Sequence, residues 1–264
     1  MQDVRDRDHH PDPRAARPSA DRDEGPPPLW GIHAVEAALA NPARRITNLC
    51  LTANAAHRMA AAVAARGIEP ELVHPKELDR RLGADTVHQG ALLEADPLAD
   101  IDLVELAMTC VDKGPLVVLD QVTDPHNVGA VMRSCAVFGA AGLAMTRRNS
   151  PPLGGALAKA ASGALEHVPV ALIQNLARSL AQLKDIGVAV IGLDGEAPDL
   201  LEDAPLLGPV AIVLGAEGKG LRQLTRESCD SLCRISTGGT LTSLNVSNAA
   251  AVALHLAAMR RRGR

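Results

Sequence analysis

Three short segments of this chain combine glycine, asparagine or serine where an apolar run gives way to a helical one. They are residues 127–134 (NVGAVMRS), 214–221 (LGAEGKGL) and 242–249 (TSLNVSNA). The N-terminus of a helix leaves backbone N–H groups free, and α/β enzymes place ligands at such junctions. Arg133 and Glu217 add ionisable side chains to two of these segments. The second half of the chain is therefore expected to hold a ligand site.

These segments do not match the motifs of several common enzyme classes. A dinucleotide fingerprint needs GxGxxG after the first strand, but residues 120–129 read DQVTDPHNVG. Residues 215–220 follow GxxGxG, and neither a Walker A sequence nor the GxSxG of hydrolases occurs. The five cysteines form no CxxC pair, and Cys229 and Cys233 lack the partners that a zinc site needs. We therefore expect no metal, and reduced, buried thiols in a cytoplasmic protein.

The composition limits both the core and the partners. Of the 264 residues 47% are hydrophobic, yet there is one Phe, one Trp and no Tyr, so the core must be aliphatic. A platform of aromatic rings for stacking RNA bases is thereby excluded. The net charge of −4 is unusual for a dedicated nucleic-acid scaffold.

Arginines cluster at 44–45, 80–81, 147–148, 222/226 and 260–264. Each cluster alone predicts a solvated face, and only convergence in space would make a phosphate-binding surface.

Composition divides the chain into four regions. Residues 1–28 carry many Asp, Arg and Pro and almost no large apolar side chains, which predicts a disordered tail. Residues 29–97 have a compact α/β pattern, residues 98–114 predict a linker with a helix, and residues 115–264 form a second domain. The charged N-terminus lacks an apolar signal core, and no apolar run approaches a membrane span, so we expect no membrane partner.

The apolar periodicity predicts the elements of both domains. In the first, helices are expected at 31–39, 54–66 and 76–82, and strands at 46–51, 71–73 and 91–94. In the second, strands are expected at 116–119, 142–145, 168–172, 188–193, 210–214 and 232–235, alternating with helices at 128–138, 153–162, 176–185, 221–228 and 246–260. This alternation implies an α/β fold with a mostly parallel sheet covered on both faces. Asn127 is well placed to cap the helix at 128–138.

Taken in order, the motifs resemble those of the SpoU RNA 2′-O-methyltransferases, a branch of the SPOUT superfamily. The three motifs are Asn127-x5-Arg133-Ser134, residues 214–220, and Ser243-Leu244-Asn245-Val246-Ser247. Residues 31–35 (GIHAV) and 88–90 (HQG) resemble the small N-terminal domain of the subgroup that methylates 23S ribosomal RNA, and residues 159–166 (KAASGALE) match another family segment. The resemblance spans residues 29–260.

The resemblance implies a fold, a cofactor and partners. The second domain is expected to be a trefoil-knotted SPOUT methyltransferase domain, preceded by a small L30e-like substrate-binding domain. S-adenosylmethionine is expected to bind bent in the knot, and the active site to lie at the interface of a homodimer. RNA is the expected substrate.

The resemblance also assigns roles to individual residues. Those expected to hold S-adenosylmethionine are Leu214, Gly215, Gly220, Ile235, Leu244 and Asn245. Those expected to act in catalysis are Asn127, Arg133, Glu217, Ser243 and Asn245. Because a guanidinium stays protonated, we expect Arg133 to fix an RNA phosphate and stabilise the developing alkoxide. The identity of the general base stays open.

The expected reaction is methylation of a ribose 2′-hydroxyl in ribosomal RNA, with a guanosine of 23S rRNA as the favoured target. Alternatives are a transfer RNA 2′-O-methyltransferase, an antibiotic-resistance enzyme of the same architecture, a non-catalytic ribosome assembly factor, and a small-molecule α/β enzyme. Lys159 and Glu166 either line the RNA entrance or are solvated charges. His33 and His88 are expected to be structural, with contact to RNA as the alternative. Ser236 stands where the family often has Pro.

Overall fold

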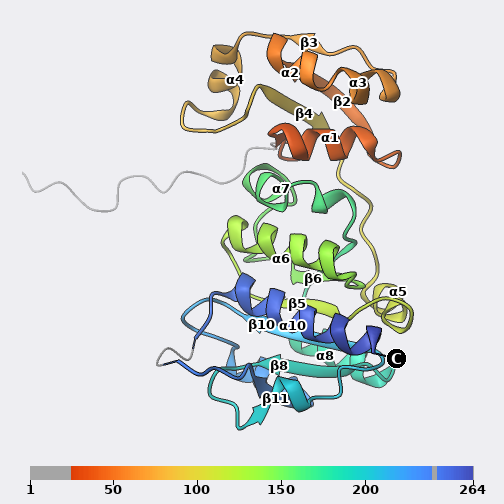
Figure 1. The fold of residues 1–264 in the computed structure, drawn as a ribbon, viewed down its shortest axis with the longest axis vertical. Helices are drawn as coiled ribbons and strands as arrows, with labels where there is room; N and C mark the ends of the chain where they lie inside the picture. Colours follow the sequence, from red (N-terminus) through yellow and green to blue (C-terminus); the bar gives the residue numbers. More distant parts are fainter. Residues whose placement is uncertain (1–24, 240–242, 264) are drawn as a thin grey trace, which may run out of the picture.

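The chain folds into two β-sheets with helices packed around them, as the computed structural model in Figure 1 shows. The structure describes residues 25–239 and 243–263. Most of the expected tail at 1–28 lies outside the described residues. Its last residues, Pro27 and Pro28, contact the backbone at Gly154 and Gly155, and the Gly155 N–H donates to the Pro28 carbonyl at 2.9 Å.

The first sheet has the strand order β1-β4-β2-β3, and its elements belong to the N-terminal part of the chain. These elements are β1 (Leu29–Trp30), α1 (Ile32–Ala40), β2 (Ile46–Leu51), α2 (Ala53–Arg58), α3 (Ala60–Arg66), β3 (Glu71–Leu72), α4 (Pro75–Leu82) and β4 (Ala91–Ala95). The single helix expected at 54–66 is broken at Met59, which joins α2 to α3 and is buried in the apolar core. Thr52 begins α2 by accepting a hydrogen bond from the Ala55 N–H.

The second sheet has the order β7-β6-β5-β10-β8-β11-β9, and within the described residues all of its neighbouring strands run parallel. Its strands are β5 (Leu116–Asp120), β6 (Gly142–Thr146), β7 (Val170–Ile173), β8 (Ala189–Leu193), β9 (Asp199–Leu200), β10 (Val210–Gly215) and β11 (Ser231–Arg234). The expected parallel sheet is confirmed, whereas the short edge strand β9 is an addition to it.

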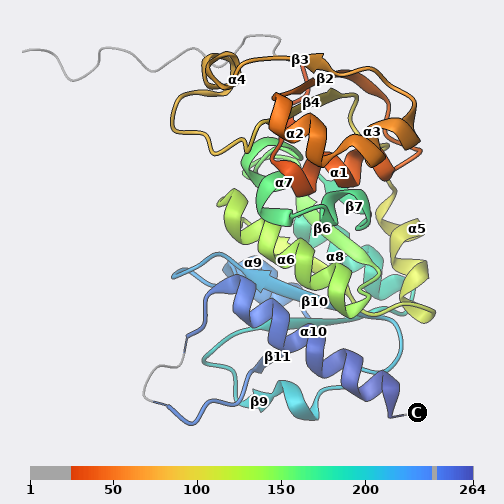
Figure 2. The same cartoon turned by 45° about the horizontal axis from the view of Figure 1, so that its top comes forward.

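Helices cover both faces of the second sheet. The helices of this part of the chain are α5 (Leu103–Met108), α6 (Pro125–Phe138), α7 (Gly155–Ala161), α8 (Leu176–Asp185), α9 (Gln223–Ser228) and α10 (Val246–Arg262), with single 3-10 turns η1 (Thr109–Val111), η2 (Ala164–Glu166) and η3 (Leu201–Asp203). Helix α7 packs on α6, α1 and β1. Helices α6 and α10 pack side by side on one face (Figure 2).

The strands alternate their side chains between two apolar cores. In β5, Val117 and Leu119 pack with α6, α7 and α10, whereas Leu116 and Val118 pack with α5 and α8. This alternation follows from the two-residue period of a strand. Because both faces are buried, the strands are continuously apolar and were recognisable in the sequence.

The described cysteines are free thiols, and four of the five are buried. Burial raises the pKa of the Cys135 thiol to about 12 and is the main cause of the raised pKa of Cys229, about 11. Among the described residues, no helix is both long and apolar enough to cross a bilayer.

Candidate active site

The carboxyl ends of β5 and β10 form a topological switch point. These strands are neighbours, yet the chain leaves β5 towards β6 and leaves β10 towards β11 on the opposite side of the sheet. In open α/β sheets, ligands bind at such a crevice. Two of the three predicted segments begin here, because Asn127 follows β5 and Gly215 ends β10.

Three polar side chains from distant segments meet at this point. Asn245 Nδ2 donates to Oδ1 of Asn127 at 3.0 Å and lies 3.4 Å from Oε2 of Glu217. Asn127 Nδ2 donates to the same Glu217 oxygen at 3.3 Å. We call Asn127, Glu217 and Asn245 the amide cluster. It joins α6, the loop after β10 and the start of α10, and each of its members was predicted as a catalytic residue.

The position of Asn245 at the start of α10 fixes the direction of its amide. Its Oδ1 accepts hydrogen bonds from the Ser247 N–H at 2.8 Å and the Ser247 hydroxyl at 2.6 Å. This is the N-cap arrangement expected for the residue before a helix. Because Oδ1 of Asn245 accepts these capping bonds, its Nδ2 faces the other way, towards Asn127 and Glu217.

Asn127 itself is not a helix cap, and that expectation was wrong. Helix α6 begins two residues earlier, at Pro125, and Asp124 is the N-cap whose carboxylate accepts from the His126 N–H at 2.9 Å. Proline is favoured in the first turn because its fixed φ suits a helix and it has no N–H to satisfy. Asn127 lies inside the first turn, so its side chain is free for the amide cluster.

A cavity of about 370 Å³ lies beside the amide cluster, over the carboxyl ends of β8, β10 and β11. Its lining includes the predicted cofactor residues Leu214, Gly215, Gly220, Ile235 and Leu244, together with Glu217 and Ser243. Asn245 does not line the cavity and reaches it only through Glu217. Leu214, Ile235 and Leu244 supply apolar walls, and the loop after Gly215 supplies exposed backbone.

Gly215 allows the chain to fold tightly against this cavity. A Cβ atom at this position would meet the Gly220 carbonyl carbon at 2.1 Å, which is a backbone clash. The loop between them closes with a hydrogen bond of 2.8 Å from the Gly220 N–H to the Ala216 carbonyl. Gly220 has φ +64, a conformation that other residues rarely adopt.

Sequence reasoning missed the acidic turn after β8. Asp194 and Glu196 line the cavity, and Asp194 forms an ion pair with Arg226, which also lines it. The Asp194 carboxylate also accepts from the Glu196 N–H at 2.9 Å. The available signal was a polar DGE turn after an apolar strand, the same kind of junction as the three segments that were recognised.

Glu202 holds the loop that follows Ile235. One carboxylate oxygen, Oε1, accepts from both the backbone N–H and the hydroxyl of Ser236, at 3.2 and 2.5 Å. The hydroxyl bond is the main cause of the lowered pKa of Glu202. Among the described residues the other oxygen, Oε2, is buried and has no hydrogen-bond partner. Ser236 thus departs from the family's proline and uses its N–H, which proline lacks.

Arg133 is not brought into the cavity of its own chain. It lies exposed on α6, about 9 Å along the helix axis from Asn127, and does not line the cavity. In the part of the chain that the structure describes, its side chain has neither a hydrogen bond nor an ion pair. Arg133 therefore lies at the surface of its own protomer.

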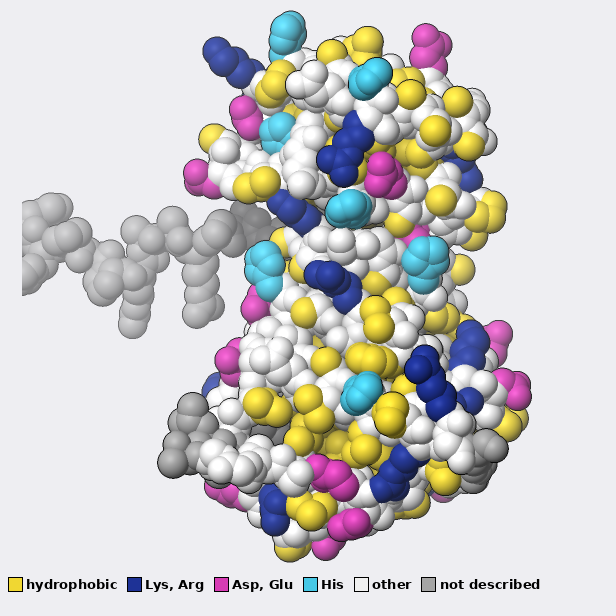
Figure 3. Space-filling view, in the orientation of Figure 1, with side chains coloured by type: hydrophobic (Ala, Val, Ile, Leu, Met, Phe, Trp, Pro, Cys, Tyr) yellow, Lys and Arg dark blue, Asp and Glu magenta, His cyan; other side chains and the backbone are white. Residues whose placement is uncertain are grey.

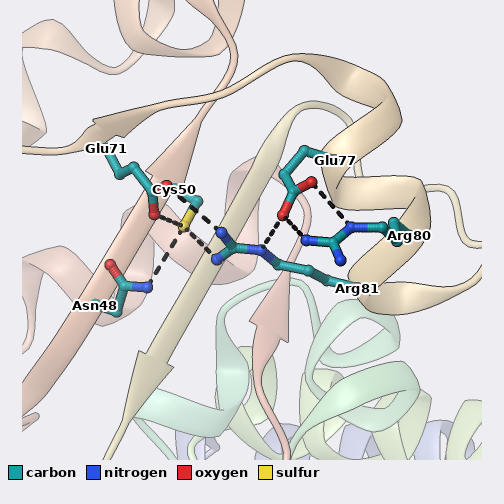
Figure 4. A network of polar contacts seen from close by, with 6 residues as sticks. All are labelled: Asn48, Cys50, Glu71, Glu77, Arg80 and Arg81. Carbon is teal, nitrogen blue, oxygen red and sulfur yellow. Dashed lines mark hydrogen bonds and ion pairs between the residues drawn. The ribbon is translucent and has the colours of Figure 1, made fainter.

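Among the described residues, several of the clustered arginines are paired or buried. Glu77 binds Arg80 at 2.6 Å and Arg81 at 2.9 Å, and Arg81 also contacts the Cys50 thiol (Figure 4). Arg147 pairs with an aspartate, and Arg44 is buried, so the expectation of a solvated face was wrong for Arg44. Figure 3 shows the basic side chains dispersed over one face.

The four remaining candidates have structural partners. The side chain of Glu166 is 2% exposed and binds Arg44, so the expectation of a solvated charge was wrong. Lys159 donates to the Val87 carbonyl. His88 is buried, accepts from the Gly90 N–H and contacts Asp79 at 3.1 Å, which confirms its structural role. His33 is exposed and lies 3.7 Å from Glu36. The described residues contain no group of three or more potential metal ligands.

Comparison with known proteins places this geometry in a family. Residues 114–255 match the model of the SpoU rRNA Methylase family, and residues 28–100 match that of RNA 2′-O ribose methyltransferase substrate binding. We call the latter range the substrate-binding module and the former the methyltransferase module.

Full-length relatives and solved structures agree with these matches. A 23S rRNA (guanosine-2′-O-)-methyltransferase RlmB of Shewanella oneidensis is 41% identical over 241 residues, covering 89% of this chain and 97% of the relative. The protein of the same name from Ralstonia nicotianae is 40% identical, covering 88% and 95%. The SpoU methyltransferase AviRb of Streptomyces viridochromogenes, solved with AdoMet, has the same fold at a TM-score of 0.74 and 21% identity, covering 89% of this chain and 90% of that one. On this match and this identity, the chain belongs to the SpoU rRNA methylase family.

Proposed function

We propose that this protein transfers a methyl group from S-adenosylmethionine to the 2′-hydroxyl of a guanosine ribose in 23S ribosomal RNA. The observation that carries the chemistry is the amide cluster at the edge of the cavity, where three polar side chains converge beside apolar walls. The target follows the named activity of the two relatives that cover almost the whole chain.

The cavity fits the cofactor. A nucleoside is bound well between apolar walls with a few main-chain donors and acceptors, and Leu214, Ile235 and Leu244 provide such walls around the Gly215 loop. The absent Cβ at Gly215 brings backbone N–H and C=O groups within reach of the cavity. When bound, S-adenosylmethionine supplies an electrophilic methyl group on a sulfonium.

The side chains of the site orient the ribose for an in-line displacement. The bound cofactor would supply the methyl carbon that the ribose 2′-oxygen attacks, with S-adenosylhomocysteine and the hydroxyl proton as the other products. Glu217 and Asn245 hold the ribose, and Asn127 holds Asn245 in place through their 3.0 Å bond. Good alignment of two reactants is worth up to about 7–11 kcal/mol of the barrier. Arg133, which stays protonated, binds the adjacent phosphate and stabilises the developing alkoxide.

The exposed position of Arg133 favours an active site shared between two copies of the chain. Arg133 lies outside the cavity of its own protomer, while Val137 on α6 and Val252 and Met259 on α10 expose large apolar side chains. Exposed apolar patches of this kind mark interaction surfaces. Figure 3 shows hydrophobic side chains over α6 and α10. We therefore infer a homodimer in which Arg133 of one protomer serves the cavity of the other.

The remaining expectations from the family are kept as parts of this proposal. They are an L30e-like RNA-binding domain at 29–97, a linker at 98–114, a trefoil knot within 115–264 that shapes the cofactor cavity, and action in the cytoplasm, where ribosomal RNA is modified. The match at residues 28–100 supports the RNA-binding role of the first domain.

The test is transfer of labelled methyl from S-adenosylmethionine to unmodified 23S RNA and, separately, to unmodified transfer RNA. Label in 23S RNA alone, mapped to a guanosine ribose, is the expected result. Label in transfer RNA alone would retain the chemistry and overturn the substrate. No label in either, with cofactor bound, would support a ribosome assembly factor instead.

A further inference from the structure

A buried ion pair joins the two modules. Arg44, in the loop before β2, binds both carboxylate oxygens of Glu166 in η2: Nη2 lies 2.7 Å from Oε1 and Nε 3.1 Å from Oε2. The two side chains are 4% and 2% exposed. Residues 44 and 166 belong to different modules and are 122 positions apart.

Further hydrogen bonds surround this pair and hold Arg44 and Glu166 in one relative orientation. Arg44 Nη1 donates to the Asp96 carbonyl at 3.0 Å, and Asn41 Nδ2 donates to Glu166 Oε2 at 2.8 Å. Arg66 donates to the backbone carbonyls of Asn41 and Arg44. Glu166 thus receives three hydrogen bonds from the substrate-binding module. A bidentate pair of this kind is directional, since only one orientation of the two planar groups satisfies it.

The surface around the pair is close-packed. One apolar core runs without a break from Val35 and Leu93 in the substrate-binding module to Val128 and Leu157 in the methyltransferase module. Two glycines allow the close approach. A Cβ at Gly155 would meet the Trp30 ring at 2.9 Å, and one at Gly163 would meet the Ala37 side chain at the same distance.

We infer that Arg44 and Glu166 are positioning residues, which lock the substrate-binding module against the methyltransferase module so that RNA is presented at a fixed distance from the methyl donor. The inference rests on the proposed function. Buried ion pairs contribute little net stability, but breaking one leaves an uncompensated charge that the interface cannot keep. The pair therefore specifies the docked arrangement more than it stabilises either module.

This inference gives a role to the segment 159–166. Lys159, Gly163 and Glu166 all contact the substrate-binding module, through Val87, Ala37 and Arg44 respectively. Helix α7 and η2 lie directly beneath α1 (Figure 1). The segment is thus a docking surface between the modules. It affects RNA specificity by placing the substrate-binding module relative to the methyl donor, and it does not itself contact the RNA.

The docking is measured as a distance in the whole protein, without RNA or cofactor. Exposed positions on α3 and α8 take spin labels through Ala60→Cys and Gln182→Cys, and excess unlabelled chain suppresses distances between protomers. The parent is expected to show one narrow distance distribution. Glu166→Gln, which leaves Arg44 unpaired, is expected to broaden it. Arg44→Lys keeps the positive charge, so the buried Glu166 carboxylate is not left without a counter-ion and the protein is expected to fold. The lysine cannot make the two-point contact of a guanidinium, so this variant is expected to broaden the distribution as well.

Methyl transfer gives the second readout. Glu166→Gln is expected to raise the KM for 23S RNA by about tenfold or more, with kcat at saturating RNA and cofactor affinity unchanged. Adding Arg44→Met to Glu166→Gln removes the unpaired charge but does not replace the directional pair, so the double variant is expected to keep the broad distribution and the raised KM. Restoration of both by the double variant would overturn the positioning role.

The matched control is Arg45→Gln. Arg45 is the neighbouring residue, and it forms an exposed pair with Asp96 at 3.1 Å, so its loss is expected to change neither readout. A narrow distribution in Glu166→Gln, or an unchanged KM, would overturn the inference. A parent protein that methylates no RNA would instead overturn the proposed function and leave the distance result to stand on its own.

Discussion

Asn245 Nδ2 donates a hydrogen bond to Oδ1 of Asn127 over 3.0 Å, although 118 residues separate the two. The bond ties the start of α10 to the first turn of α6, and Glu217 completes the contact from the loop after β10. All three sit beside the proposed cofactor cavity.

Removing the Arg133 guanidinium is expected to abolish transfer without affecting the cofactor. Arg133 does not line the cavity, so Arg133→Ala is expected to bind S-adenosylmethionine as the parent does. Losing a donor that stabilises developing negative charge lowers turnover by about 10²–10³-fold. Arg133→Lys keeps the charge but loses the fork, and is expected to lie between the two. Calorimetric titration and methyl transfer measure the two effects, and full turnover in the alanine variant would disprove the assigned role.

Asn245 is expected to have separable structural and functional roles. Asn245→Ala removes the cap of α10 and should lower the free energy of unfolding by about 0.5–2 kcal/mol. Asn245→Ser retains a capping oxygen but has no amide nitrogen for Asn127 and Glu217. We expect the serine variant to unfold near the parent's denaturant midpoint and yet to lose transfer. If it kept full transfer, the amide contact would be structural only.

A methyl group at Gly215 is expected to displace the cofactor loop. The added Cβ would lie 2.1 Å from the Gly220 carbonyl carbon, so the backbone must move. We expect Gly215→Ala to weaken S-adenosylmethionine binding by at least about tenfold, a cost of about 1.4 kcal/mol. Gly238→Ala is the control, because no atom of the described residues lies within 4 Å of its Cβ position. Equal affinities of the two variants would show that the loop does not form the binding surface.

The contact between Glu202 and Ser236 is expected to make stability depend on pH in the acid range. The pKa of Glu202 is lowered from 4.5 chiefly by the Ser236 hydroxyl. A carboxylate with a lower pKa in the folded state stabilises the fold at neutral pH. That contribution is lost as the pH falls from the unfolded value through the lower folded one.

The difference in free energy of unfolding between the parent and Glu202→Gln should therefore be constant above about pH 5 and should shrink as the pH falls below that value. Denaturant unfolding at a series of pH values measures this difference. Asp203→Asn, at the exposed neighbouring position, controls for the loss of one negative charge in the same turn. If this difference in free energy of unfolding stayed constant down to strongly acid pH, the contact between Glu202 and Ser236 would not be the source of the pH dependence.

Much of the fold was encoded locally and could be predicted from the sequence. The apolar runs at 116–119 and 210–214 predicted buried parallel strands because their side chains leave no polar face. The glycine, asparagine and serine residues at the strand-to-helix junctions marked the loops that carry the site. The segments that hold Glu217 and Asn245 were marked in this way, through residue types that suit helix starts and tight turns, whereas the roles of the two residues came from the family resemblance.

The tertiary structure alone decided which of these residues meet. The pairing of β5 with β10 brings Asn127 near Glu217, and the packing of α10 on α6 adds Asn245; no local pattern encodes either. Likewise, the charge of Glu166 reads as solvated in the sequence, whereas packing buries it against Arg44. Helices and turns depend on hydrogen bonds between near neighbours in sequence, so the chain predicts them by itself. Burial and long-range pairing depend on what the rest of the fold brings alongside, and only the folded chain fixes them.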